Sequence, residues 1–294
     1  MFAPFSQLHD WQDKTTGLAY YHFLVELESR LEEDINEIMG ELTWVQSNFF
    51  STQNLLISLT ASEDIIPFAF DELGAFIHHV PQEAFAPVAH QFITRNTNEG
   101  IPAPVKIQYV VKGGNFFRKG YSYTGKLRVL SNILSNEYLY KELRVKGGAY
   151  GGGAGFTLDG YQYFYSYRDP NLSESLDVYN SVPEYLRSFD CSPRDMVKYI
   201  LGEISTLDYP KTPEATGVQG DLDYITGFTT ADRQQIRDEV LATKVEDIRG
   251  YADMIEAIMS KNHYAVFGNE EKIKEFAGLF DVITPVYKQS ETKG

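Results

Sequence analysis

Arg144 and Tyr150 are the residues whose types and spacing best suit chemistry on a bound ligand. Arg144 lies near the end of a predicted helix, and Tyr150 follows on a glycine-flanked strand. In one continuous helix, six residues would place the two side chains about 240° apart, so Gly147 and Gly148 provide the break that lets them converge. A guanidinium and a phenol both donate hydrogen bonds, as a peptide carbonyl or an oxyanion requires. From residue types and spacing alone, a purely structural pair is the favoured alternative.

The stretch GGAYGGGAG at residues 147–155 invites a phosphate-loop interpretation. It lacks the lysine and Ser/Thr of the Walker pattern and the spacing of the dinucleotide fingerprint. The alternative is that these glycines, Gly151 among them, relax the strand or let another backbone approach closely. A small-ligand site in this stretch, independent of Arg144, stays open.

The sequence lacks the usual patterns of metal and nucleophile sites. Zinc peptidases usually place two histidines and a carboxylate at close helical spacing, and neither HExxH nor HxxEH occurs here. His22 and Glu26, four residues apart, are expected to be a surface pair, and the adjacent His78 and His79 point to different sides of their element. Cys191 has no histidine near it in the sequence, and no GxSxG elbow occurs. We therefore predict neither a metal site nor an autonomous hydrolase.

The elements that must hold Arg144 and Tyr150 follow from periodicity. Apolar residues at helical spacing predict a helix over 124–148 that ends at the glycine pair. Asp159 and Gly160 are a strong hairpin signal between two strands, and Ser192 followed by Pro193 marks a helix start. The remaining expected elements are strands at 105–113, 149–158, 161–168 and 263–268 and helices at about 172–188, 230–241, 244–259 and 269–280. This order predicts an α+β fold in which helices pack on one face of a mainly antiparallel sheet.

The N-terminal part reads as helix, helix, strand and helix. Apolar steps predict helices within 17–50, with Gly40 and Thr43 as the punctuation, a buried strand at 54–62 and a helix near 65–78. Four prolines between residues 81 and 104 predict a linker. We expect one domain or domain fragment with its linker at 1–95 and a second domain at 96–294.

Composition limits the choice of partners. The chain has 41 acidic and 26 basic residues and a formal charge of −15, which argues against a nucleic-acid partner because that requires a basic surface. An acidic surface that merely aids solubility is the alternative to attraction of basic ligands. No apolar run approaches the roughly 20 residues of a membrane helix. The only cysteine excludes an internal disulfide, and with no secretory leader visible we expect a reducing, cytoplasmic setting.

The segments LRVKGGAYG and YQYFYSYRDPNLSESLDVYNSVPEYL resemble the C-terminal half of presequence-protease-type members of the insulinase (pitrilysin) family. GLAYYHFLVELE followed by NLLISLT is similar to the end of that family's third domain. The resemblance covers nearly the whole chain, most specifically residues 104–285. Tyr167, Arg168 and Asp169 also match the family's pattern, and we interpret them as a strand end, a turn and a helix start.

The resemblance implies a zinc endopeptidase in which two homologous halves enclose short unstructured peptides in a closed chamber. Zinc would belong to the N-terminal half of the same polypeptide, and none is expected in this chain. Arg144 and Tyr150 would contact the substrate and its tetrahedral intermediate, with Gly147, Gly148 and Gly151 as substrate-binding positions. The acidic charge would favour basic peptides by steering. The chain alone would be inactive and would expose a large surface that promotes self-association.

A second reading comes from another class of protein. Halves of this family can persist as subunits that only hold peptide or stabilise an assembly. A zinc-bearing partner half would distinguish the peptidase from such a non-catalytic peptide-binding or scaffold subunit.

Overall fold

The computed structural model describes residues 2–3, 6–82, 91–92 and 97–287. The chain divides into two compact units. The larger unit comprises Met1–Asp10, Ile93–Tyr209 and Thr230–Gly294, and the smaller unit comprises Trp11–Phe92 and Pro210–Thr229. The predicted domain boundary at residues 95 and 96 touches residues outside the described ranges, so it stays a prediction.

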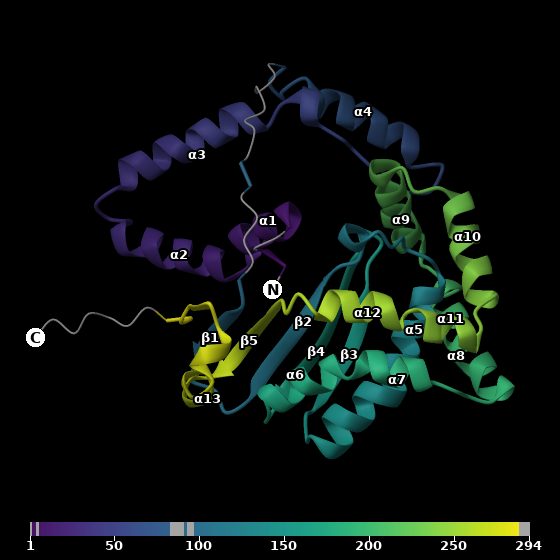
Figure 1. Ribbon diagram of the computed structural model, residues 1–294. Helices are drawn as coiled ribbons and strands as arrows, with labels where there is room; N and C mark the ends of the chain where they lie inside the picture. The colour runs from purple at the N-terminus through teal and green to yellow at the C-terminus, as the bar shows by residue number, and fades with distance from the viewer. Residues whose placement is uncertain (1, 4–5, 83–90, 93–96, 288–294) are drawn as a thin grey trace, which may run out of the picture. The chain divides into compact units, whose positions relative to one another are not determined.

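A six-stranded sheet lies at the centre of the larger unit, with strand order β3-β4-β2-β5-β1-β6 (Figure 1). The strands are β1 Glu99–Ala103, β2 Gln108–Asn115, β3 Gly151–Phe156, β4 Tyr161–Asp169, β5 Tyr264–Asn269 and β6 Val282–Ile283. Neighbours from β3 to β5 are antiparallel, whereas β1 runs parallel to β5 and β6. The α+β class is confirmed, with a parallel edge added to the expected antiparallel sheet.

Strand β1 lies in a segment whose prolines predict a linker. Pro102 has no N–H to donate, but its carbonyl oxygen accepts a 3.3 Å hydrogen bond from the amide of Val286. The prediction of a linker throughout 81–104 is therefore wrong for its last part. A proline that still accepts on one side can be accommodated in a strand.

Helices pack against the sheet of the larger unit. In the larger unit they are α5 Lys126–Ile133, the π-helix η4 Leu134–Lys146, α6 Ser173–Asn180, α7 Val182–Ser188, α8 Pro193–Leu207, α10 Thr230–Leu241, α11 Val245–Gly250, α12 Ala252–Met259 and α13 Glu270–Glu275, with 3-10 turns η3 Phe117–Lys119 and η5 Ala277–Leu279. Figure 1 shows α6 and α12 crossing one face of the sheet. Val110, Phe164 and Tyr179 are fully buried in this layer, and the Tyr179 hydroxyl donates to the Val110 carbonyl at 3.1 Å.

The helix that leads to Arg144 also covers the outer edge of β3. The Ser131 hydroxyl donates to the carbonyl oxygen of Ala154 at 2.8 Å, and the Ala154 amide donates to the Ser135 hydroxyl at 3.0 Å. These bonds satisfy backbone groups that an edge strand would otherwise expose. They also fix the long helix in register with β3, which begins directly after Tyr150.

Two local signals in the sequence are confirmed by the structure. The Asp159–Gly160 turn joins β3 to β4, and Gly160 has a positive φ of 89°. The Ser192 hydroxyl accepts a 3.2 Å hydrogen bond from the amide of Asp195, with Pro193 at the first position of α8. Both rest on contacts within a few residues, which the sequence specifies directly.

The smaller unit is helical and departs from prediction near Gly40, at residues 54–62 and at residues 213–226. Its elements are α2 Leu18–Arg30, α3 Ile35–Phe49, η2 Thr52–Asn54, α4 Ile66–Ile77 and α9 Pro213–Thr226, and α1 Gln7–Thr16 runs across the division between the units. The break expected at Gly40 and Thr43 falls at residues 31–34 instead, and both residues lie inside α3. The strand expected at 54–62 is wrong, because these residues pair with no strand in the described chain, and an unpaired strand is not stable.

Helix α9 was not predicted, although the sequence contains the residues that begin and end it. The Thr212 hydroxyl accepts from the amide of Ala215 at 3.2 Å, Pro213 occupies the first helical position, and Gly227 ends the helix with a φ of 70°. No described helix is long and apolar enough to cross a membrane.

Candidate functional site

A tight turn connects the π-helix η4 to strand β3. The amide of Gly147 donates to the Glu142 carbonyl at 3.0 Å, and the amide of Ala149 donates to the Leu143 carbonyl at 2.9 Å. Gly148 has a φ of 79°, a conformation that favours glycine. π-Helical geometry is rare and concentrates at functional sites. The turn at residues 147–149 reverses the chain between Arg144 and Tyr150.

This turn brings Arg144 and Tyr150 together. The guanidinium carbon of Arg144 lies 5.7 Å from the centre of the Tyr150 ring and 5.5 Å from that of Tyr140. Arg144 is exposed, and Tyr150 keeps 57% of its surface accessible. Cation–π contact at this distance orders both side chains while leaving their N–H and O–H donors open to a ligand.

Two residues of β4 complete the surroundings of the Tyr150 ring. The guanidinium carbon of Arg168 lies 5.4 Å from its centre, and the Tyr167 ring meets it edge-on at 5.5 Å. The Tyr150 amide donates to the Arg168 carbonyl at 3.2 Å, which joins the two strand ends. Arg168 has a positive φ of 49°, which is uncommon outside glycine and often marks functional positions.

The sequence interpretation of SYRDPN is therefore incomplete. Asp169 is structural, because it is fully buried and accepts from the Asn171 amide at 2.9 Å and the Ser175 hydroxyl at 2.7 Å. Tyr167 and Arg168 contact Tyr150 directly, a relation that sequence reasoning missed. The hairpin register, which pairs Gly151 with Tyr167, was the available signal.

The three glycines have packing roles in the turn. A Cβ atom on Gly151 would lie 2.6 Å from the Tyr167 ring, and one on Gly147 would lie 2.6 Å from the Leu143 carbonyl oxygen. Gly148 supplies the left-handed conformation. Contact of Gly147, Gly148 or Gly151 with substrate stays a prediction.

The described residues do not offer a metal site. No group of three or more His, Cys, Asp or Glu side chains that could hold a metal ion occurs among residues 2–3, 6–82, 91–92 and 97–287. The donor set required for zinc is thus not met by this part of the chain, and no step is assigned to zinc here. Burial, aided by Asp195 and Asp190, raises the pKa of Cys191, the opposite of what a thiolate nucleophile requires.

Comparison with known proteins shows which family the chain resembles. Residues 98–268 match the family described as PreP C-terminal domain. The chain is 38% identical over 281 residues to Protein HypA of Clostridium perfringens and 30% identical over 272 residues to Presequence protease 1, chloroplastic/mitochondrial, of Arabidopsis thaliana. These alignments cover 95% and 90% of this chain but 28% and 25% of the two relatives, so it spans about a quarter of their length.

A solved structure shows the same fold. The crystal structure of pitrilysin superposes with a TM-score of 0.50 at 10% identity, over 70% of this chain and 23% of that one. The family match covers more than half of the chain, and the Arg144–Tyr150 turn lies inside it. The chain therefore belongs to the PreP C-terminal domain family, the presequence-protease branch of the insulinase (pitrilysin) peptidases.

Proposed function

We propose that this chain is the substrate-binding C-terminal part of a zinc endopeptidase that degrades short unstructured peptides inside a closed chamber. The observation that carries the proposal is the exposed Arg144–Tyr150 pair at a glycine turn, in a chain that belongs to a peptidase family. Zinc bound in an N-terminal half outside this chain would act as the Lewis acid that activates water. The chain by itself is inactive.

Arg144 and Tyr150 bind and orient the scissile peptide in this proposal. Both keep hydrogen-bond donors at the surface, and donors aimed at a developing oxyanion stabilise it more than the starting carbonyl. Arg168 lies against the Tyr150 ring and positions it. The net charge of −15 would steer basic peptides toward the chamber, in the cytoplasmic setting that the single cysteine favours.

Peptide cleavage by this chain mixed with a zinc-bearing N-terminal half of the same family tests the roles. At equal zinc, Arg144→Ala and Tyr150→Phe should each lower kcat/KM by roughly 100-fold, as for loss of one oxyanion donor. The matched control is Tyr209→Phe, which removes an exposed phenol elsewhere in the larger unit. It should retain full activity.

The rival reading, a non-catalytic peptide-binding or scaffold subunit, gives a different pattern. Peptide would then bind the mixture without being cut, and both variants would leave turnover at background. Activity of this chain alone, or indifference of cleavage to both substitutions, would overturn the assigned roles.

A further inference from the structure

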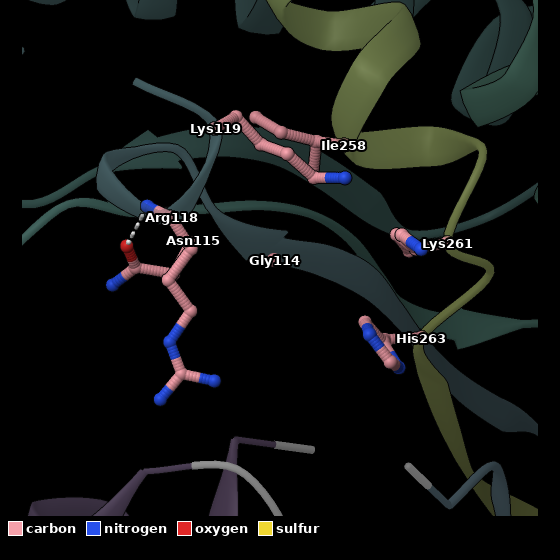
Figure 2. Close-up of a pocket in the computed structure, with 7 residues that line it drawn as sticks. All are labelled: Gly114, Asn115, Arg118, Lys119, Ile258, Lys261 and His263. Atoms are coloured by element: carbon pink, nitrogen blue, oxygen red, sulfur yellow. Dashed lines mark hydrogen bonds between the residues drawn. The ribbon is translucent and has the colours of Figure 1, made fainter. Parts of the chain in front are cut away.

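A second site lies in the larger unit, at the end of the sheet away from Tyr150. Seven residues line a pocket of about 210 Å³ (Figure 2): Gly114, Asn115, Arg118, Lys119, Ile258, Lys261 and His263. They come from the end of β2 with the turn η3, from Ile258 in α12, and from the loop that joins α12 to β5. Asn115 pairs with Tyr161 at one end of β4, whereas Tyr150 bonds to Arg168 at the other. Seven residues of strand separate the two ends by about 23 Å.

The pocket is basic in an acidic protein. Arg118, Lys119 and Lys261 carry permanent positive charges, His263 can add a fourth, and no carboxylate is among the lining residues. Neither lysine forms an ion pair with another residue in the described part of the chain. Like charges held close together are costly unless an anion compensates them.

His263 reports the positive field in the pocket. Burial lowers its pKa, and the charges of Lys261, Lys119, Arg118 and Lys112 lower it further. All four cations therefore lie within electrostatic range of one imidazole. An anion among them would raise the pKa of His263.

The walls of the pocket are fixed before any ligand arrives. Buried Lys112 donates from Nζ to Oδ1 of Asn180 at 2.6 Å and to Oδ1 of Asn262 at 2.7 Å. Asn262 has a positive φ of 55° and lies between Lys261 and His263, so these bonds hold the loop that carries both. The backbone that presents Lys261 and His263 is therefore ordered before a ligand binds, which lowers the entropy lost on binding.

The opposite wall is held in a similar way. Oδ1 of Asn115 accepts from the amide of Arg118 at 3.3 Å, and its Nδ2 donates to the Asp159 carbonyl at 3.1 Å. Gln162, which pairs with Gly114 and so shares its face of the sheet, is fully buried, and its side-chain amide has no hydrogen-bond partner among the described residues. A polar group left so is costly, but Gln162 is not among the residues that line the pocket.

We infer that this pocket binds a phosphoryl oxyanion with at least two negative charges. A single carboxylate would neutralise only one of the two lysine charges, whereas a phosphate or diphosphate group accepts from several directions and matches the ammonium donors that Lys119 and Lys261 present from the two walls. The volume is below the roughly 300–1,000 Å³ of pockets for drug-sized ligands, as suits a small anion. The site does not depend on the proposed peptidase function.

Calorimetry on the 294-residue chain tests the site, with inorganic phosphate, pyrophosphate, ADP and acetate at constant ionic strength. Pyrophosphate should bind saturably and acetate should not. Lys119→Ala and Lys261→Ala should each weaken pyrophosphate binding about tenfold, as for loss of one charge-assisted hydrogen bond. Binding of ADP as tight as that of pyrophosphate would identify the phosphoryl end of a larger ligand, whereas preference for the inorganic anions would identify free phosphate.

The matched control is Lys106→Ala, which removes an exposed lysine before the opposite end of β2. It should leave the affinity unchanged, and in NMR titrations pyrophosphate should raise the pKa of His263 in wild type and control alike. Absence of saturable binding to any phosphate, equal binding of acetate, or the same loss in Lys106→Ala would overturn the inference.

Discussion

The side-chain amide of Asn171 donates a 2.6 Å hydrogen bond to the carbonyl oxygen of Gly147. Twenty-four residues separate the two positions, and the bond ties the start of α6 to the turn between Arg144 and Tyr150. Asn171 is itself held by Asp169, which accepts from its backbone amide. The turn that positions the candidate site is thus supported from β4 and α6 as well as by its own glycines.

Asn171→Ala should loosen this turn. Loss of one hydrogen bond at a half-buried carbonyl costs about 1 kcal/mol of unfolding free energy, and cleavage by the reconstituted enzyme should fall because Arg144 and Tyr150 flank the turn. Asn171→Asp places an oxygen against the Gly147 carbonyl and should be at least as damaging. Urea denaturation and kcat/KM measure both effects. Asn136→Ala, which removes an exposed amide bonded within its own helix, is the control, and equal losses there would contradict the role of Asn171.

Arg168→Ala should affect catalysis mildly. Its guanidinium approaches the Tyr150 ring at 5.4 Å, and an exposed cation–π contact stabilises by about 0.5–1 kcal/mol, which corresponds to a two- to fivefold decrease in kcat/KM. Arg168→Lys keeps the cation and should retain most activity. A decrease in Arg168→Ala as large as that in Arg144→Ala would instead place Arg168 in direct contact with substrate.

Lys112 should make stability rise with pH. Burial lowers its pKa to about 8, although Asp177 opposes the shift, whereas an unfolded lysine titrates near pH 10.4. Between these values the unfolded chain binds more protons, so unfolding becomes less favourable as pH rises. A neutral amine keeps two hydrogens, enough for both asparagine bonds.

The difference between wild type and Lys112→Met isolates this contribution above pH 7.5, because His263, whose pKa the charge of Lys112 lowers, is already neutral there. Between pH 7.5 and 9.5, the free energy of unfolding of wild type should rise relative to that of Lys112→Met by on the order of 1–2 kcal/mol. Urea denaturation measures this change. A difference independent of pH would show that Lys112 keeps an ordinary pKa.

The isolated chain should self-associate through the smaller unit. Several large apolar side chains of α3 and α4 are more than half exposed: Leu42, Trp44, Phe49, Phe68 and Phe70. Large exposed apolar surface marks an interface or an aggregation risk. Light scattering should show mass rising with concentration at moderate salt, and Phe68→Glu with Phe70→Glu should reduce it. A monomer at all concentrations would contradict the prediction.

Local signals in the sequence were sufficient for much of the larger unit. The hairpin turn at Asp159–Gly160 and the cap at Ser192 depend on contacts within four residues, so residue types alone predict them. The helix before Gly147 was also predicted, but its π-helical second half was not, because helical periodicity does not distinguish the two geometries. Helix α9 was missed, although Thr212, Pro213 and Gly227 are the same kind of signal as Ser192 and Pro193.

The strand predicted at 54–62 shows where local reasoning ends. Its apolar residues have the composition of a buried strand, but a strand exists only when a neighbour supplies the other half of its hydrogen bonds. The described part of this chain supplies none.

Residue types and spacing by themselves determined the family resemblance, the α+β class and the candidates Arg144 and Tyr150. Only the tertiary structure decided that Arg168 and Tyr167 lie against Tyr150, and that β2, η3 and the α12–β5 loop gather Arg118, Lys119, Lys261 and His263 around one pocket. The reason is distance along the chain. Strand register and loop packing bring together residues that are 150 positions apart, as in the bond between Lys112 and Asn262, and such contacts leave no periodic pattern in the sequence.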